Sequence, residues 1–159
     1  MKTLIVFDSV FGCTEAIARA MGDVFSRHGH CDVVQAGHMA AHYLEEVDLI
    51  VVGSPTRAFR PTPALVRVLR NLPPKSLTGF EAVAFDTRMD VSKAPGILRF
   101  MAGIFGYAAA PIARQLRRKG ARLVLPPQGF IVGGTEGPVC DGEAQRAREL
   151  AEKLLAPRA

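Results

Sequence analysis

The sequence predicts an α/β protein in which a parallel sheet of five strands, in the order 2-1-3-4-5, carries helices on both faces. Short apolar runs alternate with longer segments whose apolar residues recur at helical spacing. The run at 47–54 is apolar almost throughout, which is typical of a strand buried on both faces of a parallel sheet. Right-handed crossovers between such strands give a doubly wound sheet, and five strands fit 159 residues.

Three strands and two helices are expected in the first part of the chain. The strands are expected at residues 2–7, 31–36 and 47–54. After the first strand, apolar residues recur every three or four positions, which predicts a helix that begins near Cys13 and ends before Gly29. A second helix is expected at 62–72, with Thr62 as its N-cap and Pro63 at its first position.

The second part of the chain continues the alternation. A fourth strand is expected at 80–87 and a helix that closes over 111–120. The fifth strand, at 121–134, is interrupted near Pro126 and Pro127, and a last helix begins near Asp141. No linker, repeat or change of composition divides the chain, so residues 1–159 are expected to form one domain.

In a doubly wound sheet, ligands bind at the carboxyl ends of the strands, where the winding reverses. This rule brings together the loops at 8–14, 54–62 and 86–96. In the first loop, Gly12 allows close backbone approach, and Ser9 and Thr14 add hydroxyl groups at the start of a helix. Unpaired amides and the helix dipole favour a phosphate there. The alternative is a tight turn that only caps the helix.

The run from Ser9 to Glu15, SVFGCTE, resembles the phosphate loop of flavodoxins, usually Ser/Thr-x-Thr-Gly-x-Thr followed by an acid. VVGSPTRAFRPTPALVRVL and AFDTRM resemble the second and third flavin loops, so the resemblance covers nearly the whole chain. It implies a flavodoxin-like three-layer sandwich that binds FMN. The cofactor-binding residues implied are Ser9, Val10, Phe11, Gly12, Cys13, Thr14, Pro55, Thr56, Arg57, Ala58, Phe59, Asp86, Thr87 and Arg88.

This resemblance implies an FMN-binding redox protein, either an electron carrier or a small FMN-dependent reductase with a quinone-like acceptor. No residue is assigned as catalytic, because the flavin would supply the chemistry. The alternative is a non-redox ligand-binding or regulatory module that has lost flavin. Phe11 stands where flavodoxins usually have threonine, and the chain has no tryptophan to stack on a flavin. Phe59 and Tyr107 are the candidates to cover the two faces of the ring.

Three arginines, Arg57, Arg60 and Arg88, lie in the second and third loops. Beside a flavin they would raise its reduction potential by stabilising the reduced anion. Alternatively they are solvated, or pair with Asp86 and Asp90. Asp86 itself would accept a hydrogen bond from the flavin or pair with Arg88. Cys13 stands at a helix N-terminus, where a thiol pKa can be lowered, although an unreactive small side chain is the simpler interpretation.

Composition bounds the remaining expectations. The net charge of +5 favours anionic partners, but no motif supports nucleic-acid binding. Three unpatterned cysteines suit the cytoplasm. His28, His30, His38 and His42 are expected to be solvated, with no metal site, although His38 and His42 could share a helical face. The apolar run at 100–113 is too short for a membrane span. Residues 97–105 are interpreted as a lid, a platform for the acceptor or a homodimer contact.

Overall fold

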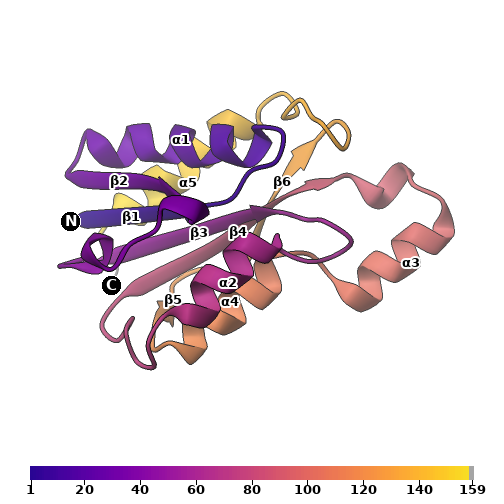
Figure 1. The fold of residues 1–159 in the computed structure, drawn as a ribbon. Helices are drawn as coiled ribbons and strands as arrows, with labels where there is room; N and C mark the ends of the chain where they lie inside the picture. The colour runs from indigo at the N-terminus through magenta and orange to yellow at the C-terminus, as the bar shows by residue number, and fades with distance from the viewer. Residues whose placement is uncertain (158–159) are drawn as a thin grey trace.

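A parallel sheet forms the centre of the molecule (Figure 1). The computed structural model describes residues 1–157. The strands run in the order β2-β1-β3-β4-β5, and β6 also pairs with β4, which confirms the predicted order. The bounds of these strands are β1 Lys2–Phe7, β2 His30–Gln35, β3 Leu49–Pro55, β4 Glu81–Met89, β5 Arg122–Leu123 and β6 Gln128–Val132. The expected fifth strand is therefore two short pieces on either side of the two prolines.

Helices cover both faces of the sheet, as predicted. α1 (Cys13–Ser26) and α5 (Glu143–Leu155) lie on one face, and α2 (Pro63–Asn71) and α4 (Ala109–Arg118) lie on the other (Figure 1). The central strands alternate between the two cores. In β1, for example, Leu4 packs in the core beneath α2 and α4, and Ile5 packs in the core beneath α1 and α5.

Local sequence signals fix the helix starts nearest the carboxyl edge of the sheet. Thr62 caps α2, because its hydroxyl accepts a hydrogen bond from the Leu65 amide at 3.4 Å, and Pro63 follows at the first helical position. α1 begins differently. Its N-cap is Gly12, in the left-handed region at φ 94°, and no side chain caps the helix from that position. The first turn of α1 is therefore approached by a tight glycine turn.

In the middle of β3, Gly53 lies opposite Phe85 of β4. A Cβ atom on Gly53 would overlap the Phe85 ring, so the absence of a side chain there lets the ring lie across the neighbouring strand. Phe85 in turn meets Phe130 of β6 edge to face, with 5.9 Å between ring centroids. This aromatic pair packs the core immediately behind the carboxyl ends of β3, β4 and β6.

The segment after β4, interpreted from the sequence as a lid, a platform or a dimer contact, forms a helix of its own, α3 (Gly96–Phe105). Figure 1 shows α3 reaching away from the rest of the molecule. By length and composition alone, the stretch at 96–118 is apolar enough to cross a membrane, but one such stretch is weak evidence for a membrane span. α3 and α4 have ten residues each, about 15 Å of helix, and α4 packs on the sheet. A hydrocarbon core is about 30 Å thick.

Short 3₁₀ turns complete the structure at Ala36–His38, Ala41–Leu44 and Val91–Lys93. They correct one expectation, because His38 and His42 lie in separate turns and share no helical face. His28, His30, His38 and His42 are all exposed, as expected. Within residues 1–157, no group of three or more His, Cys, Asp or Glu side chains is arranged to hold a metal ion.

Candidate functional site

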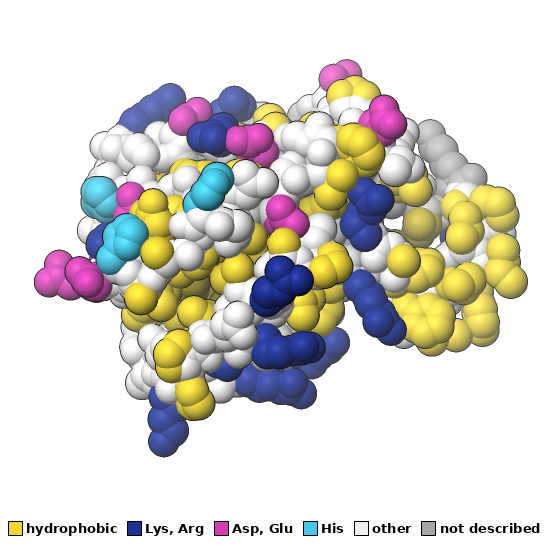
Figure 2. All heavy atoms as spheres, in the orientation of Figure 1, with side chains coloured by type: hydrophobic (Ala, Val, Ile, Leu, Met, Phe, Trp, Pro, Cys, Tyr) yellow, Lys and Arg dark blue, Asp and Glu magenta, His cyan; other side chains and the backbone are white. Residues whose placement is uncertain are grey.

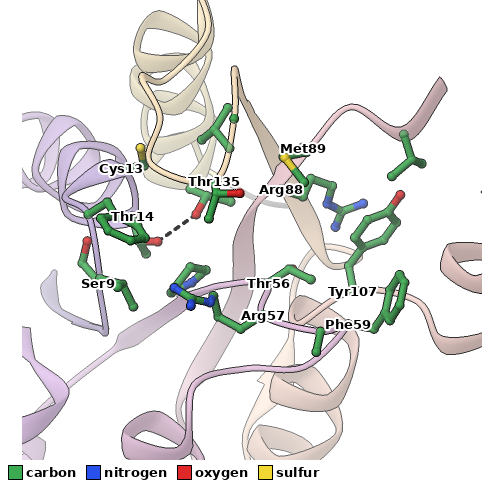
Figure 3. A pocket seen from close by; sticks show the side chains of 18 of the residues that line it. Ser9, Cys13, Thr14, Thr56, Arg57, Phe59, Arg88, Met89, Tyr107 and Thr135 are labelled. Carbon is green, nitrogen blue, oxygen red and sulfur yellow. Dashed lines mark hydrogen bonds between the residues drawn. The ribbon is translucent and has the colours of Figure 1, made fainter. Parts of the chain in front are cut away.

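A cavity of about 270 Å³ lies at the carboxyl edge of the sheet, where the three predicted loops meet. Of the predicted binding residues, all except Gly12 and Asp86 line it. Figure 3 shows these side chains converging from the start of α1, the loop after β3 and the end of β4. The topological rule applied to the sequence therefore located a cavity in the folded chain.

The first loop presents backbone donors to one end of the cavity. In the described part of the chain, the amides of Val10, Phe11, Cys13 and Thr14 donate to no other group. The Ser9 hydroxyl oxygen accepts from the Gly12 amide at 3.0 Å and from the Glu15 amide at 3.4 Å, so it holds the loop in shape. Four free amides at the start of a 14-residue helix create a local positive potential suited to an anion.

Thr14 ties this loop to the centre of the sheet. Its hydroxyl group lies 2.8 Å from that of Thr87 in β4, and both side chains are buried. The dashed line in Figure 3 marks this bond. Thr14 was predicted as a hydroxyl donor to a ligand, and either hydroxyl can be the donor in this bond. When Thr87 donates, the Thr14 hydroxyl keeps its proton for a ligand. The bond also links the first loop to the third.

The second loop is a tight hairpin turn at 57–60. Arg57 and Arg60 exchange backbone hydrogen bonds of 2.8 and 2.9 Å, and the two residues between them, Ala58 and Phe59, have φ values of 48° and 66°. A type I′ turn needs positive φ at both central positions, where Asn-Gly is the usual pair. Each non-glycine residue there costs about 1–2 kcal/mol. The turn projects Phe59 along the cavity wall, where its ring lies 5.7 Å from that of Phe105.

Arg57 leans from this turn towards the first loop, as Figure 3 shows. Its guanidinium carbon lies 5.8 Å from the centroid of the Phe11 ring, in a cation–π arrangement. Phe11 replaces the threonine usual in flavodoxin loops, and here it forms a contact surface for a cation from the neighbouring loop. The first loop has no lysine, and the fold places the cation of Arg57 beside its Phe11 side chain.

The third loop contains a buried ion pair. Arg88 donates from Nε and Nη2 to the two carboxylate oxygens of Asp86, at 2.6 and 2.7 Å, and the Ala109 amide donates to one of the same oxygens at 2.9 Å. The Arg88 guanidinium also stacks over the Tyr107 ring, 3.7 Å from its centroid. One carboxylate therefore joins β4 to the start of α4 and orients two residues of the cavity wall, Arg88 and Tyr107.

This arrangement decides between the two roles expected for Asp86. Its side chain is fully buried, does not line the cavity, and binds Arg88. Burial raises the pKa of the Asp86 carboxyl, and the hydrogen bonds from Arg88 and the Ala109 amide oppose that rise. The prediction that Asp86 contacts a ligand is therefore corrected to a role in positioning Arg88. Because Arg88 is paired, it adds little net charge to the cavity, whereas Arg57 and Arg60 form no ion pair among the described residues.

Cys13 is also partly buried, against the loop that follows β6. Its sulfur lies 4.0 Å from the Glu136 carbonyl oxygen, and Gly137 packs so closely that a Cβ atom would crowd the sulfur. Burial raises the pKa of the Cys13 thiol, so the suggestion of a lowered pKa is wrong. The interpretation of Cys13 as an unreactive small side chain fits this contact.

Sequence reasoning missed a fourth loop. Gly134 and Thr135, which follow β6, line the cavity between the first and third loops. β6 is parallel to β4, so its carboxyl end lies at the same edge, and the rule that selected the other loops applied to it equally. Apolar side chains at the end of β4 and in the segment after it were also missed as lining residues, namely Met89, Val91 and Leu98.

No protein-family model matches the sequence, and no curated protein matches it. Solved structures do. A flavodoxin from the domain Archaea superposes with a TM-score of 0.73 at 21% identity, over 97% of this chain and 96% of that one. Oxidised flavodoxin 1 from Bacillus cereus gives 0.74 at 17% identity, over the full length of both chains. The rubredoxin:oxygen oxidoreductase of Desulfovibrio gigas gives 0.71 at 18% identity, over 98% of this chain and 37% of that one.

Identities of this size show a shared fold. The chain therefore has the flavodoxin-like fold that the resemblance implied, from end to end.

Proposed function

We propose that this chain is an FMN-binding redox protein of one domain that acts in the cytoplasm. The observation that carries the proposal is the group of four free amides at the start of α1, beside a cavity lined mainly by apolar groups. A phosphate monoester needs several backbone donors and a positive potential, and a flavin ring needs an apolar slot next to them. Both conditions are met at one end of the sheet, in the fold that flavodoxins share.

The residues present fit the two ends of FMN. The amides of residues 10, 11, 13 and 14 would hold the phosphate, with Arg57 as the nearby cation. The turn at 57–60 and Tyr107 would enclose the ring. When bound, FMN supplies the electron and hydride transfer chemistry. The chain binds and orients the cofactor, excludes water with Phe59 and Tyr107, and sets the local charge through its arginines.

The charge of the protein favours a small-molecule or anionic partner. The chain carries 20 Lys and Arg against 15 Asp and Glu, a net charge of +5. A surface of this sign attracts anionic partners and repels cationic ones. Of the two redox roles, we favour a small reductase with a quinone-like acceptor, because apolar Met89 and Leu98 line the cavity beside the third loop. An electron carrier that meets an anionic protein partner is the second candidate.

The amide site can be tested at Gly12, whose open surroundings leave room for a side chain. Asn and Asp tolerate its left-handed backbone better than other side chains, and they differ mainly in charge. We expect Gly12→Asn to keep FMN binding and Gly12→Asp to weaken it about tenfold or more, because the new negative charge would lie next to the amides proposed to hold the phosphate. Quenching of flavin fluorescence on titration of the apo-protein measures both constants.

Riboflavin separates the phosphate end from the ring end. It has no phosphate, so Gly12→Asp and Gly12→Asn should bind it equally. Equal weakening of FMN by the two variants would show that the loop does not hold the phosphate. If neither flavin binds the unsubstituted protein, the alternative of a non-redox ligand-binding module holds instead.

A further inference from the structure

α3 leaves an apolar surface uncovered at one end of the molecule. Of its ten residues, Arg99 alone is charged and Ala102 alone is buried. Ile97, Phe100 and Ile104 follow one another at helical spacing with 69%, 66% and 61% of their surfaces exposed. Figure 2 shows hydrophobic side chains gathered where Figure 1 draws α3. A cluster of this kind marks an interaction surface.

The apolar residues are not confined to one stripe of this helix. Leu98 and Phe105, on a second face, are also exposed, by 42% and 61%. Phe105 touches Phe59, and Leu98 lines the flavin cavity, so that face is only partly used by the chain itself. A groove on another protein covers one stripe of a helix, whereas the boundary between lipid headgroups and acyl chains surrounds most of it. The distribution therefore favours a lipid surface.

A basic groove continues the surface from the end of α3. Phe105 shares this groove with three arginines, Arg60, Arg114 and Arg118, which come from the second loop and from α4. None of the three makes an ion pair within the described residues. Figure 2 shows Lys and Arg side chains on the side of the molecule where α2 and α4 lie, next to the apolar end. Exposed arginines beside an apolar helix suit phosphate headgroups.

We infer that α3 and this groove form a docking surface for an anionic lipid bilayer, with α3 lying in the interface and Arg60, Arg114 and Arg118 on the headgroups. Charge argues against a second copy of the chain as the occupant. Two copies would each bring a net charge of +5 and the same three unpaired arginines to one contact. An anionic bilayer attracts each of these charges. This inference goes beyond the proposed redox function and does not depend on it.

The test uses the full chain and vesicles of phosphatidylcholine, either alone or mixed in equal parts with phosphatidylglycerol. The chain contains no tryptophan, so Phe100→Trp introduces a single reporter on α3. We expect the protein to sediment with the phosphatidylglycerol vesicles, and the emission of the introduced tryptophan to shift to shorter wavelength on binding. Binding to phosphatidylcholine alone should be much weaker, and salt should reduce the difference.

Substitutions separate the two parts of the surface. Arg114→Gln with Arg118→Gln should weaken vesicle binding about 25-fold, since each surface cation near an anionic leaflet contributes about fivefold. The matched control, Arg27→Gln with Lys153→Gln, removes the same charge from α5 and the end of α1, on the opposite face of the sheet, and should change binding little. Phe100→Ser with Ile104→Ser should weaken binding by more than about tenfold. Far-ultraviolet circular dichroism checks that each variant is folded.

Three results would overturn the inference. One is the absence of sedimentation with phosphatidylglycerol vesicles. Another is an equal loss of binding in the Arg114/Arg118 variant and in its Arg27/Lys153 control. The third is a dimer in sedimentation equilibrium in which the tryptophan emission of the Phe100→Trp variant is already shifted without lipid, because a second copy of the chain would then cover α3.

Discussion

Replacing Asp86 with alanine should cost about 3 kcal/mol of stability, although its side chain does not line the cavity. The substitution removes the acceptor of two hydrogen bonds from Arg88 and of one from the Ala109 amide, all shorter than 3 Å. Breaking a buried ion pair by deleting one partner typically costs about 3–5 kcal/mol. The Arg88 side chain retains 21% of its exposure, so solvent offsets part of the loss and places the cost near the lower limit.

Urea unfolding followed by far-ultraviolet circular dichroism measures this loss. In a thermal scan, about 3 kcal/mol corresponds to a fall in Tm of about 6–12 °C for a domain of this size. Arg19→Ala is the control, because it breaks an ion pair with Glu15 that is exposed on both sides. Exposed pairs of this kind contribute about 0.3–0.5 kcal/mol.

A double-mutant cycle tests the reasoning behind the number. Asp86→Leu combined with Arg88→Met removes both charges, so it should cost clearly less than the sum of the two single variants. Arg88 also holds Tyr107 by stacking, and Asp86→Ala should therefore weaken flavin binding together with stability. A loss below about 1 kcal/mol, or single costs that simply add, would refute the view that this pair holds β4 to α4.

Three further predictions concern backbone strain, packing and pH. Ala58→Gly should raise the free energy of unfolding by about 0.5–1 kcal/mol, because the backbone φ at Ala58 is 48°. The control Ala64→Gly, within α2, should lower it by about 1 kcal/mol. If both substitutions changed the free energy of unfolding in the same direction, the turn would not be strained. Gly53→Ala should lower the melting temperature sharply, because the new methyl group meets the Phe85 ring, and an unchanged scan would show that the ring moves freely. Hydrogen bonds from a neighbouring arginine, and from a backbone amide, lower the pKa of Glu143. Its ionised form therefore adds stability above about pH 4.3 that is lost as pH falls through the lowered pKa. Glu143→Gln should be about 1 kcal/mol less stable at pH 7, with the difference vanishing in acid, and a difference independent of pH would contradict this.

The fold followed from the sequence because local and global signals agree. Apolar runs fixed the central strands, and Thr62 with Pro63 marked the start of α2 to the residue. The same topological rule brought the first three loops to one cavity. The rule was not applied to the loop after β6, although β6 ends at the same edge of the sheet, and Gly134 and Thr135 were therefore omitted.

Other features had no local signature. The Asp86–Arg88 pair was one of the two roles expected for Asp86, but the third hydrogen bond to its carboxylate comes from the amide of Ala109, 23 positions away. The turn at 57–60 uses Ala-Phe where positive φ is required, and propensity argues against that turn. The sequence at 96–105 is apolar apart from Arg99, so periodicity did not identify the segment as a separate helix.

The ring contact between Phe59 and Phe105 joins the turn of the cofactor cavity to the exposed helix. A ligand that moves one of these rings therefore changes how favourably the other ring packs. If a bilayer binds the flavin-loaded form a given number of times more tightly than the empty form, flavin must bind the bilayer-bound form more tightly by the same factor. Measuring flavin affinity with and without vesicles, and again in Phe105→Ala, would reveal whether this single aromatic contact transmits that reciprocity.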